Sequence, residues 1–207
     1  MPKHGSGSPT LHRPKSLLKS EQDLKILYPK PLIAVAGILG LWLFAIAAGS
    51  PKLVTEKSKI EFVGSKPSAA HKGGFKTFVV DGSIDWEKPS NSNLTIDIDA
   101  TSLWSDDGGL TSHLKNRDFF NVDAYPKIRF ETTKIELAGD GAATISGKLI
   151  LLDQTVEVTT PCKVELSDAG LKIGAKLTID RTRWGMTYGQ GRVNNEVDVA
   201  VTLVFAR

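Results

Sequence analysis

The segment HLKNRDFFNVDAYPKIRF, from His113 to Phe130, combines one histidine with aspartate, arginine and aromatic side chains. Histidine beside a carboxylate can carry out general acid–base catalysis, and the same residue types bind zinc. Outside the first thirty residues the only other histidine is His71. A zinc site needs a third ligand, and no cysteine or carboxylate near either histidine is spaced like a metal motif. We therefore expect no metal site.

The carboxylate pairs of the sequence also have simple structural explanations. Asp97 and Asp99 alternate along a strand-like run and point to its solvated face, and Asp106 and Asp107 lie in the turn-forming SDDGG. No G-x-S-x-G nucleophile signature is present, and nothing places two carboxylates across a cleft as glycoside hydrolysis requires. The single cysteine, Cys162, follows a proline without a histidine beside it and is interpreted as a packed residue. The sequence therefore predicts no catalytic residue and no cofactor.

The elements that must position these side chains alternate with a period of two. NLTIDIDATSLW, LKIGAKLTID and EVDVAVTLVF each place apolar residues on one face and polar residues on the other, which indicates strands with one buried face. Eight such runs lie near residues 59–64, 76–86, 93–104, 127–137, 142–152, 156–166, 171–180 and 196–205. Short links such as GDG, LDQ and SDAG favour an up-and-down antiparallel meander. A barrel or a sandwich satisfies this pattern, and closure into a barrel removes the exposed strand edges.

The two longest connections, 105–124 and 181–193, are expected at the mouth of such a barrel. LTSHLKNRDFF has helical spacing, with Thr111 or Ser112 as a candidate N-cap, and predicts a short helix across one end. Aromatic and large apolar residues gather in or beside these connections, among them Trp104, Phe119, Phe120, Trp184 and Tyr188. The pattern leaves two alternatives open: a container with an apolar cavity, or a barrel filled by its own side chains.

The N-terminal quarter of the chain differs from the rest in its charge and its apolar content. Residues 1–30 carry six basic and two acidic residues, a net charge of +4, whereas the whole chain of 207 residues has only +3. Residues 31–51 contain no charge and are long enough to span a bilayer as a helix. The basic flank predicts a cytoplasmic tail and an exported domain. A cleaved signal peptide is the competing interpretation, since Ala45-Ile46-Ala47 fits a cleavage site.

Several spaced strings resemble the YceI-like, polyisoprenoid-binding family. They are HLKNRDFFNVDAYPKIRF, the hairpin ATISGKLILLDQTVEVTTPCKVEL, the turn LTIDRTRWGM and the closing strand EVDVAVTLVFA. The resemblance covers residues 55 to 207 and implies a lipocalin-like eight-stranded antiparallel barrel whose cavity holds a long apolar chain. Family ligands include polyisoprenoids, quinone-like molecules and fatty amides, and the proteins are usually periplasmic or secreted. No catalytic residue or cofactor follows from it.

The resulting expectation is an all-β fold, an eight-stranded lipocalin-like barrel with a short helix at one end, preceded by a single N-terminal transmembrane helix. Its parts are a disordered cytoplasmic tail (1–30), a transmembrane anchor or signal peptide (31–51) and a lipid-binding barrel (55–207). The expected function is extracytoplasmic binding, storage or transport of a long-chain apolar ligand, with the domain tethered to the inner membrane or released after cleavage. The alternatives are a structural or partner-binding barrel with a filled core and an enzyme that modifies lipid or quinone.

Alternation parity and the two connections give the candidate ligand-binding residues: Phe62, Phe78, Ile96, Ile98, Phe119, Phe130, Ile145, Leu149, Ile179, Trp184, Met186 and Val199. His71, His113 and Arg181 are candidates for orienting a polar head group. The expected partners are an apolar lipid, the membrane through residues 31–51, a second copy in a homodimer and a membrane electron-transfer protein. Nucleic acid is not expected, because no basic face is visible after residue 51.

Overall fold

The computed structural model describes residues 52–207, so the expected tail and apolar segment (1–51) lie outside the described residues. The strands are β1 (Lys52–Leu53), β2 (Lys59–Lys66), β3 (Ala69–Phe75), β4 (Phe78–Ser83), β5 (Asn93–Asp99), β6 (Leu103–Ser105), β7 (Lys127–Leu137), β8 (Ala142–Leu151), β9 (Gln154–Ser167), β10 (Gly170–Asp180) and β11 (Glu196–Ala206). The helices are α1 (Gly108–Lys115) and the 3₁₀ turns η2 (Thr55–Lys57), η3 (Pro89–Asn91), η4 (Ala100–Ser102) and η5 (Arg181–Trp184). Within this part of the chain, no helix has both the length and the apolar character needed to cross a membrane.

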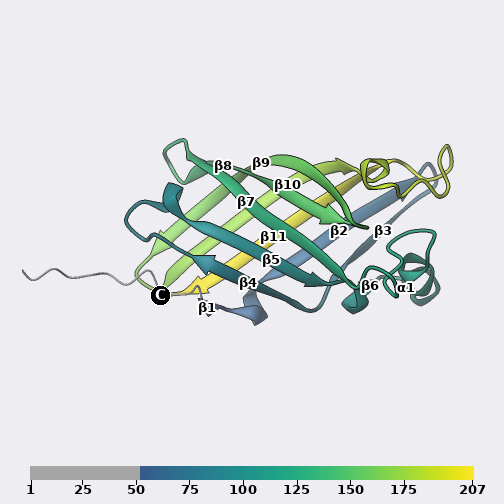
Figure 1. The fold of residues 1–207 in the computed structure, drawn as a ribbon, viewed down its shortest axis with the longest axis horizontal. Helices are drawn as coiled ribbons and strands as arrows, with labels where there is room; N and C mark the ends of the chain where they lie inside the picture. The colour runs from purple at the N-terminus through teal and green to yellow at the C-terminus, as the bar shows by residue number, and fades with distance from the viewer. Residues whose placement is uncertain (1–51) are drawn as a thin grey trace, which may run out of the picture. The chain divides into compact units, whose positions relative to one another are not determined.

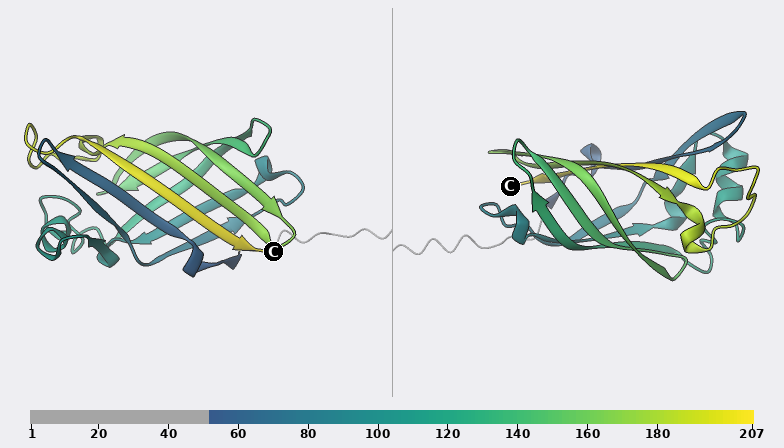
Figure 2. Two further views of the ribbon diagram at one scale, coloured as in Figure 1. Left: turned by 180° about the vertical axis from the view of Figure 1, so that it is seen from behind. Right: turned by 90° about the horizontal axis from the view of Figure 1, so that it is seen from above.

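All strands belong to one antiparallel sheet in the order β4-β5-β7-β8-β9-β10-β11-β2-β3-β6, with β1 beside β11 (Figure 1). The left view of Figure 2 shows β10, β11 and β2 lying side by side across the back of the molecule. From β7 to β11 each strand pairs with the next, as the meander predicted; the links up to β10 are short turns, whereas residues 181–195 join β10 to β11. Leu152 and Asp153 both have positive φ, as the two-residue hairpin turn between β8 and β9 requires.

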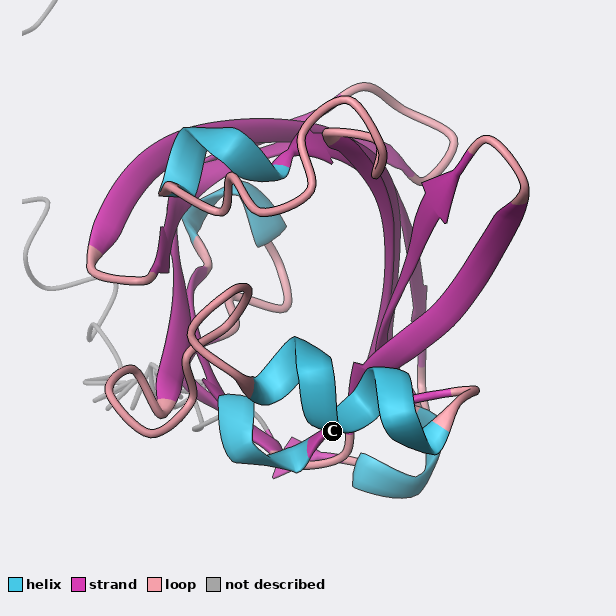
Figure 3. Ribbon diagram, turned by 90° about the vertical axis from the view of Figure 1, so that its right-hand side faces the viewer, coloured by secondary structure: helices cyan, strands magenta, loops and turns pink. Residues whose placement is uncertain are grey.

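The sheet is strongly curled, and the eight expected runs all contribute strands to it, whereas β3 (Ala69–Phe75) was not expected. Seen from the end that carries α1 (Figure 3), the strands curve around a common axis. β3 and β4 are one chain segment interrupted at Lys76 and Thr77, and β5 and β6 are likewise joined through η4. Between these interruptions the Thr77 N–H donates to Ser102 Oγ (3.0 Å) and the Asp99 N–H to the Thr77 carbonyl (3.0 Å).

The expected unbroken eight-stranded barrel is therefore corrected to a curled sheet with an incomplete ladder. β4 and β6, the two ends of the pairing order, are not paired with each other. The ladder also stops between β9 and β10 at Cys162 and Ala175, because Pro161 has no N–H to donate. The Thr160 hydroxyl makes the last link by donating to the Lys176 carbonyl (3.2 Å).

Inward-facing apolar side chains of the strands form the core. On β5, Leu94, Ile96 and Ile98 are buried, while Asp97 on the opposite face accepts two hydrogen bonds from Arg129 (2.6 and 2.8 Å). Cys162 is buried as expected. The most completely covered side chains include Ile84, which follows β4, and Phe205, near the C-terminal end of β11. In Figure 1 the C-terminal end of β11 lies away from α1. That end is filled by side chains, and room for a ligand must lie toward α1.

The short helix α1 forms where it was expected, but its N-cap differs. Asp107 caps the helix, because its Oδ1 accepts the Leu110 N–H (2.6 Å), whereas Thr111 and Ser112 lie inside the first turns and their hydroxyls bond to backbone carbonyls. An aspartate one residue before the first helical residue is a better cap than a hydroxyl already within the helix, since its backbone is extended. The helix ends at Lys115, so it does not reach the following Asp118.

We predict that Gly170→Ala destabilises the domain by about 2 kcal/mol or more. Gly170 has a φ of +146°, and an added Cβ would overlap the Phe205 carbonyl on the paired strand. Gly174→Ala in the same strand is the matched control, because an added Cβ meets nothing within 4 Å, and it should change the free energy of unfolding by less than about 0.5 kcal/mol. Urea unfolding measures both, and equal losses in the two variants would contradict the assignment.

Candidate ligand-binding cavity

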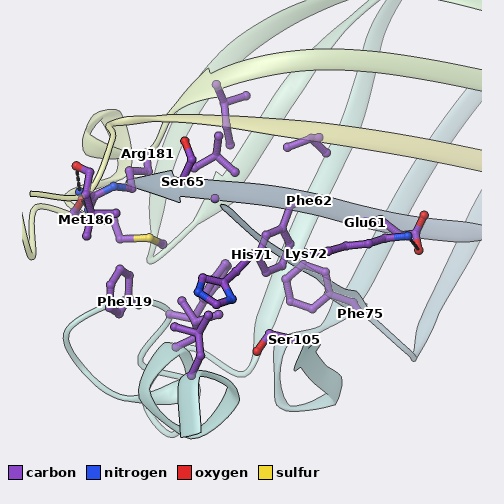
Figure 4. A pocket seen from close by; sticks show the side chains of 18 of the residues that line it. Glu61, Phe62, Ser65, His71, Lys72, Phe75, Ser105, Phe119, Arg181 and Met186 are labelled. Atoms are coloured by element: carbon purple, nitrogen blue, oxygen red, sulfur yellow. Dashed lines mark hydrogen bonds and ion pairs between the residues drawn. The ribbon is translucent and has the colours of Figure 1, made fainter. Parts of the chain in front are cut away.

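A cavity of about 470 Å³ opens at the end of the curled sheet that carries α1 (Figure 4). Its wall consists mainly of inward-facing apolar side chains from seven strands, which are Ile60, Phe62, Phe75, Ile98, Ile128, Leu149, Leu151, Ile179, Val197 and Val199. Leu110 and Leu114 of α1 and Phe119 and Phe120 of the next loop line the side toward the helix. This volume is in the range of pockets that bind one small molecule, and such pockets have mainly apolar linings.

Seven of the twelve candidate ligand-binding residues line this cavity: Phe62, Ile98, Phe119, Leu149, Ile179, Met186 and Val199. The other five, Phe78, Ile96, Phe130, Ile145 and Trp184, belong to the packed core or lie against it. Parity placed Phe78, Ile96, Phe130 and Ile145 inside the sheet, and Trp184 was expected at the mouth; all five are instead packed in or against the core. Whether the seven contact a ligand stays a prediction.

Aromatic rings form one wall of the cavity. Phe62, Phe75 and Phe120 lie in mutual contact, with ring centroids 5.7 to 6.0 Å apart. Gly73 on β3 makes this arrangement fit, because a Cβ at that position would overlap the Phe62 ring. Phe75 and Ile128 line the cavity but were not among the predicted ligand-binding residues. Ile128 faces the same side of its strand as Phe130, so the two-residue period could have identified it.

The two long connections meet at the mouth through aromatic side chains. His113 of α1, Phe119 of the following loop and Tyr188 of the 185–195 connection have ring centroids 5.1 to 5.3 Å apart in edge-to-face arrangements. His113 Nε2 also lies 3.2 Å from Asp118 Oδ2. Tyr188 keeps 42% of its surface exposed, so it lies at the boundary between cavity and solvent.

The two candidate head-group histidines are both tied to carboxylates. His71 Nδ1 lies 2.9 Å from Asp106 Oδ1, and Asp106 also accepts the Lys72 N–H (2.9 Å). These hydrogen bonds lower the pKa of Asp106 and link β3 to the residues just before α1. Over residues 52–207, no group of three His, Cys, Asp or Glu side chains is placed to hold a metal ion.

Arg181 is the buried charge of the site. Only 3% of its surface is exposed, and its guanidinium donates to the carbonyls of Met186 (2.5 Å), Asn194 (3.1 Å) and Val193 (3.3 Å). Its charge also lies 6.0 Å from the centre of the Phe119 ring. Burial lowers the pKa of Arg181, although the neighbouring Asp180 acts in the opposite direction. Arg181 thus holds the 185–195 connection over the mouth and lines the cavity.

The fold and cavity define a curled antiparallel β domain with an apolar interior and one covered mouth. Residues 52–205 match the YceI-like domain, so the chain belongs to the YceI-like family, and the resemblance found in the sequence is confirmed.

Relatives and solved structures agree with this assignment. Over 89 residues the chain is 35% identical to a UPF0312 protein of Pseudomonas putida strain F1, a match that covers 42% of this chain and 45% of the relative. The match thus spans less than half of that relative. The crystal structure of Burkholderia cenocepacia BcnA is similar with a TM-score of 0.69 and 25% identity, covering 74% of this chain and 99% of BcnA. A polyisoprenoid binding domain from Saccharophagus degradans, implicated in plant cell wall breakdown, shares the fold with a TM-score of 0.61 and 17% identity, covering 77% and 98%.

We predict that Trp184→Phe lowers the free energy of unfolding by about 2 kcal/mol. Trp184 is 1% exposed, and its indole N–H donates to the Leu149 carbonyl (3.0 Å), so the substitution removes both a buried hydrogen bond and packed volume. Trp104→Phe is the control, because Trp104 is half-buried and its indole N–H has no acceptor among residues 52–207. Urea unfolding should show a clearly smaller loss for Trp104→Phe, and a similar loss would argue against the buried role of Trp184.

Proposed function

We propose that this domain binds the hydrocarbon chain of a lipid-like molecule in the cavity beneath α1, as a container and not as a catalyst. The observation that carries the proposal is the cavity itself, about 470 Å³ walled by apolar side chains of seven strands and covered by α1. A barrel filled by its own side chains would have no such space. Membership of the YceI-like family and the similarity to a polyisoprenoid binding domain from Saccharophagus degradans support the same ligand class.

The enzyme alternative receives less support from the cavity. Ionisable side chains do line the mouth, among them Glu61, His71 and Lys72. Glu61 pairs with Lys72 (2.9 Å), and His71 is tied to Asp106. Each of these groups therefore has a structural partner, and none stands alone against the apolar wall as a general acid or base. Binding without chemistry is the simpler function for this arrangement.

Chain burial should supply most of the binding free energy. Each CH₂ group transferred from water to an apolar site contributes about 0.8 kcal/mol, which is roughly a fourfold gain in affinity. Because the core fills the far end of the sheet, the gain should stop once the chain fills the cavity. Longer chains would then leave carbons at the mouth, where α1 and the 185–195 connection cover them only in part.

We also propose that the domain acts outside the cytoplasm, held by residues 31–51 as an anchor or released after cleavage. The support is the uncharged run of 31–51 behind a tail of net charge +4. Alkaline phosphatase fused after Arg207 should be active in bacterial cells expressing the full chain, because that enzyme needs export for activity. An inactive fusion that is stably produced would contradict this location. The homodimer and the electron-transfer partner stay predictions.

The proposed ligand class predicts that the full chain, purified from its native membranes without added lipid, carries a co-purifying apolar molecule. Native mass spectrometry should detect it as an added mass that organic solvent extracts. A folded protein that carries no such mass and also fails to bind a fluorescent apolar probe would contradict the proposal.

Leu149→Trp should abolish or strongly reduce binding of the apolar probe, by at least about tenfold in Kd, because the indole occupies the cavity. Lys148→Trp is the matched control, since Lys148 is the exposed neighbour on the opposite face of β8 and should bind the probe like the unchanged protein. Thermal unfolding of both variants tests that they fold. Equal probe affinity for the two folded variants would show that the probe binds elsewhere.

A further inference from the structure

One group of polar side chains lies at the mouth of the cavity around Arg181. Arg181 lies directly after β10, at the mouth end, with Ser65 and Asn194 beside it (Figure 4 shows Arg181 and Ser65). The Asn194 side-chain amide donates to Ser65 Oγ (2.9 Å), and the Asn194 carbonyl accepts from Arg181 Nε (3.1 Å). We call these three residues the polar corner. The aromatic wall around Phe75 lies deeper in the cavity than this corner (Figure 4).

The charge in this corner makes no ion pair among the described residues, and the neighbouring Asp180 acts on it only from a longer distance. Within residues 52–207, no carboxylate oxygen lies within 4.0 Å of an Arg181 nitrogen, although the side chain is 97% buried. The carboxylates that line the cavity are engaged elsewhere: Glu61 pairs with Lys72, and Asp107 caps α1. A guanidinium stays protonated in proteins, so this is a buried positive charge beside a mainly apolar cavity, with no carboxylate in direct contact with it.

The hydrogen bonds of Arg181 leave part of its donor capacity unused. A guanidinium carries five N–H groups, and the three carbonyls of Met186, Val193 and Asn194 accept one each. One N–H on Nη1 and one on Nη2 therefore have no acceptor among the described residues. A structural clamp for the 185–195 connection needs only the three bonds that are made. The remaining donors and the uncompensated charge fit an anionic oxygen.

We propose that Arg181 is the specificity-determining residue of the cavity and that the ligand is an amphiphile with an anionic oxygen head group, a carboxylate or a phosphate, held in the polar corner with its chain toward Phe75. This inference rests on the proposed binding of an apolar chain and deepens it. Charge-assisted hydrogen bonds are about twice as strong as neutral ones, and they strengthen in a site that excludes water. The same chain with a neutral head group is held only by burial of its hydrocarbon.

The test compares three ligands with one chain: dodecanoate, dodecyl phosphate and dodecan-1-ol, each displacing a fluorescent apolar probe from the full chain at pH 7 and low salt. We expect at least one anion to bind roughly tenfold or more tightly than the alcohol. Which of the two anions binds more tightly shows whether the site prefers a carboxylate or a phosphate head group. If the alcohol binds as tightly as both anions, the inference is wrong while the proposed function stands. If none of the three displaces the probe, the proposed function itself fails.

Variants of Arg181 and Arg183 distinguish a contact between Arg181 and the ligand head group from the role of Arg181 in holding the 185–195 connection. Arg181→Gln loosens the 185–195 connection and should weaken all ligands, but it should also bring the ratio of anion to alcohol affinity close to one. Arg181→Lys, which keeps the charge, should retain most of the ratio. Arg183→Gln is the matched control, because Arg183 lies in the same turn, is exposed and does not line the cavity, so the ratio should not change. An unchanged ratio in folded Arg181→Gln would overturn the inference.

A measurement on the unchanged protein covers the case in which Arg181 variants do not fold. Carboxyl-¹³C dodecanoate bound to the full chain should titrate, by NMR, at a lower pH than free dodecanoate, because the positive charge stabilises the carboxylate. Burial in an apolar cavity without that charge would raise the pKa of the carboxyl group instead. The direction of the pKa shift of bound dodecanoate therefore shows whether its carboxyl group lies beside the positive charge or only in an apolar cavity. A raised pKa would overturn the inference.

Discussion

The curl of a single antiparallel sheet is the constraint on which the rest of this structure depends. It brings the inward faces of β2, β5, β8 and β10 to one interior, although these strands are far apart in the sequence. Side-chain volume then divides that interior in two. Residues such as Phe205 and Ile84 fill the far end almost completely. Toward α1 the inward-facing aliphatic and aromatic side chains leave a cavity between them. The cavity is thus the unfilled half of one continuous core.

Inward-facing glycines contribute to the same division. The Phe62 ring lies over Gly73 and the Phe130 ring over Gly147, in each case where an added Cβ would overlap the ring. A ring that lies flat over a neighbouring glycine keeps close to the sheet and extends less into the interior. Glycine weakens a strand on its own account, since it adds backbone entropy to the unfolded chain. The packed rings offset that weakness, and the space inside the sheet is preserved for another molecule.

The period of two was sufficient to predict most of the strands, though not β3, together with the antiparallel order from β7 to β11 and the inward parity of residues such as Ile98 and Val199. Parity assigns a face but not a position along the strand, which is why Ile145 lies in the packed core and not in the cavity wall. Phe78 lies in the core although it pairs with the cavity residue Ile98. The bends at Lys76 and η4 depend on contacts between strands distant in sequence, so the alternation pattern could not locate them. Asp107 was overlooked as a helix cap, because the turn-forming SDDGG also explained its presence.

The cavity is closed by much weaker structure than the sheet that forms its walls. The walls are held by backbone hydrogen bonds between paired strands, whereas α1 and the 185–195 connection meet through the rings of His113, Phe119 and Tyr188 and through the hydrogen bonds of Arg181. Elements joined by few buried contacts open at lower free energy than paired strands do. A ligand would therefore enter and leave beside Tyr188 while the sheet stays intact. Because Arg181 holds this connection and also lines the cavity, an anionic head bound there would strengthen the closed mouth, and binding and closure would be coupled through one side chain.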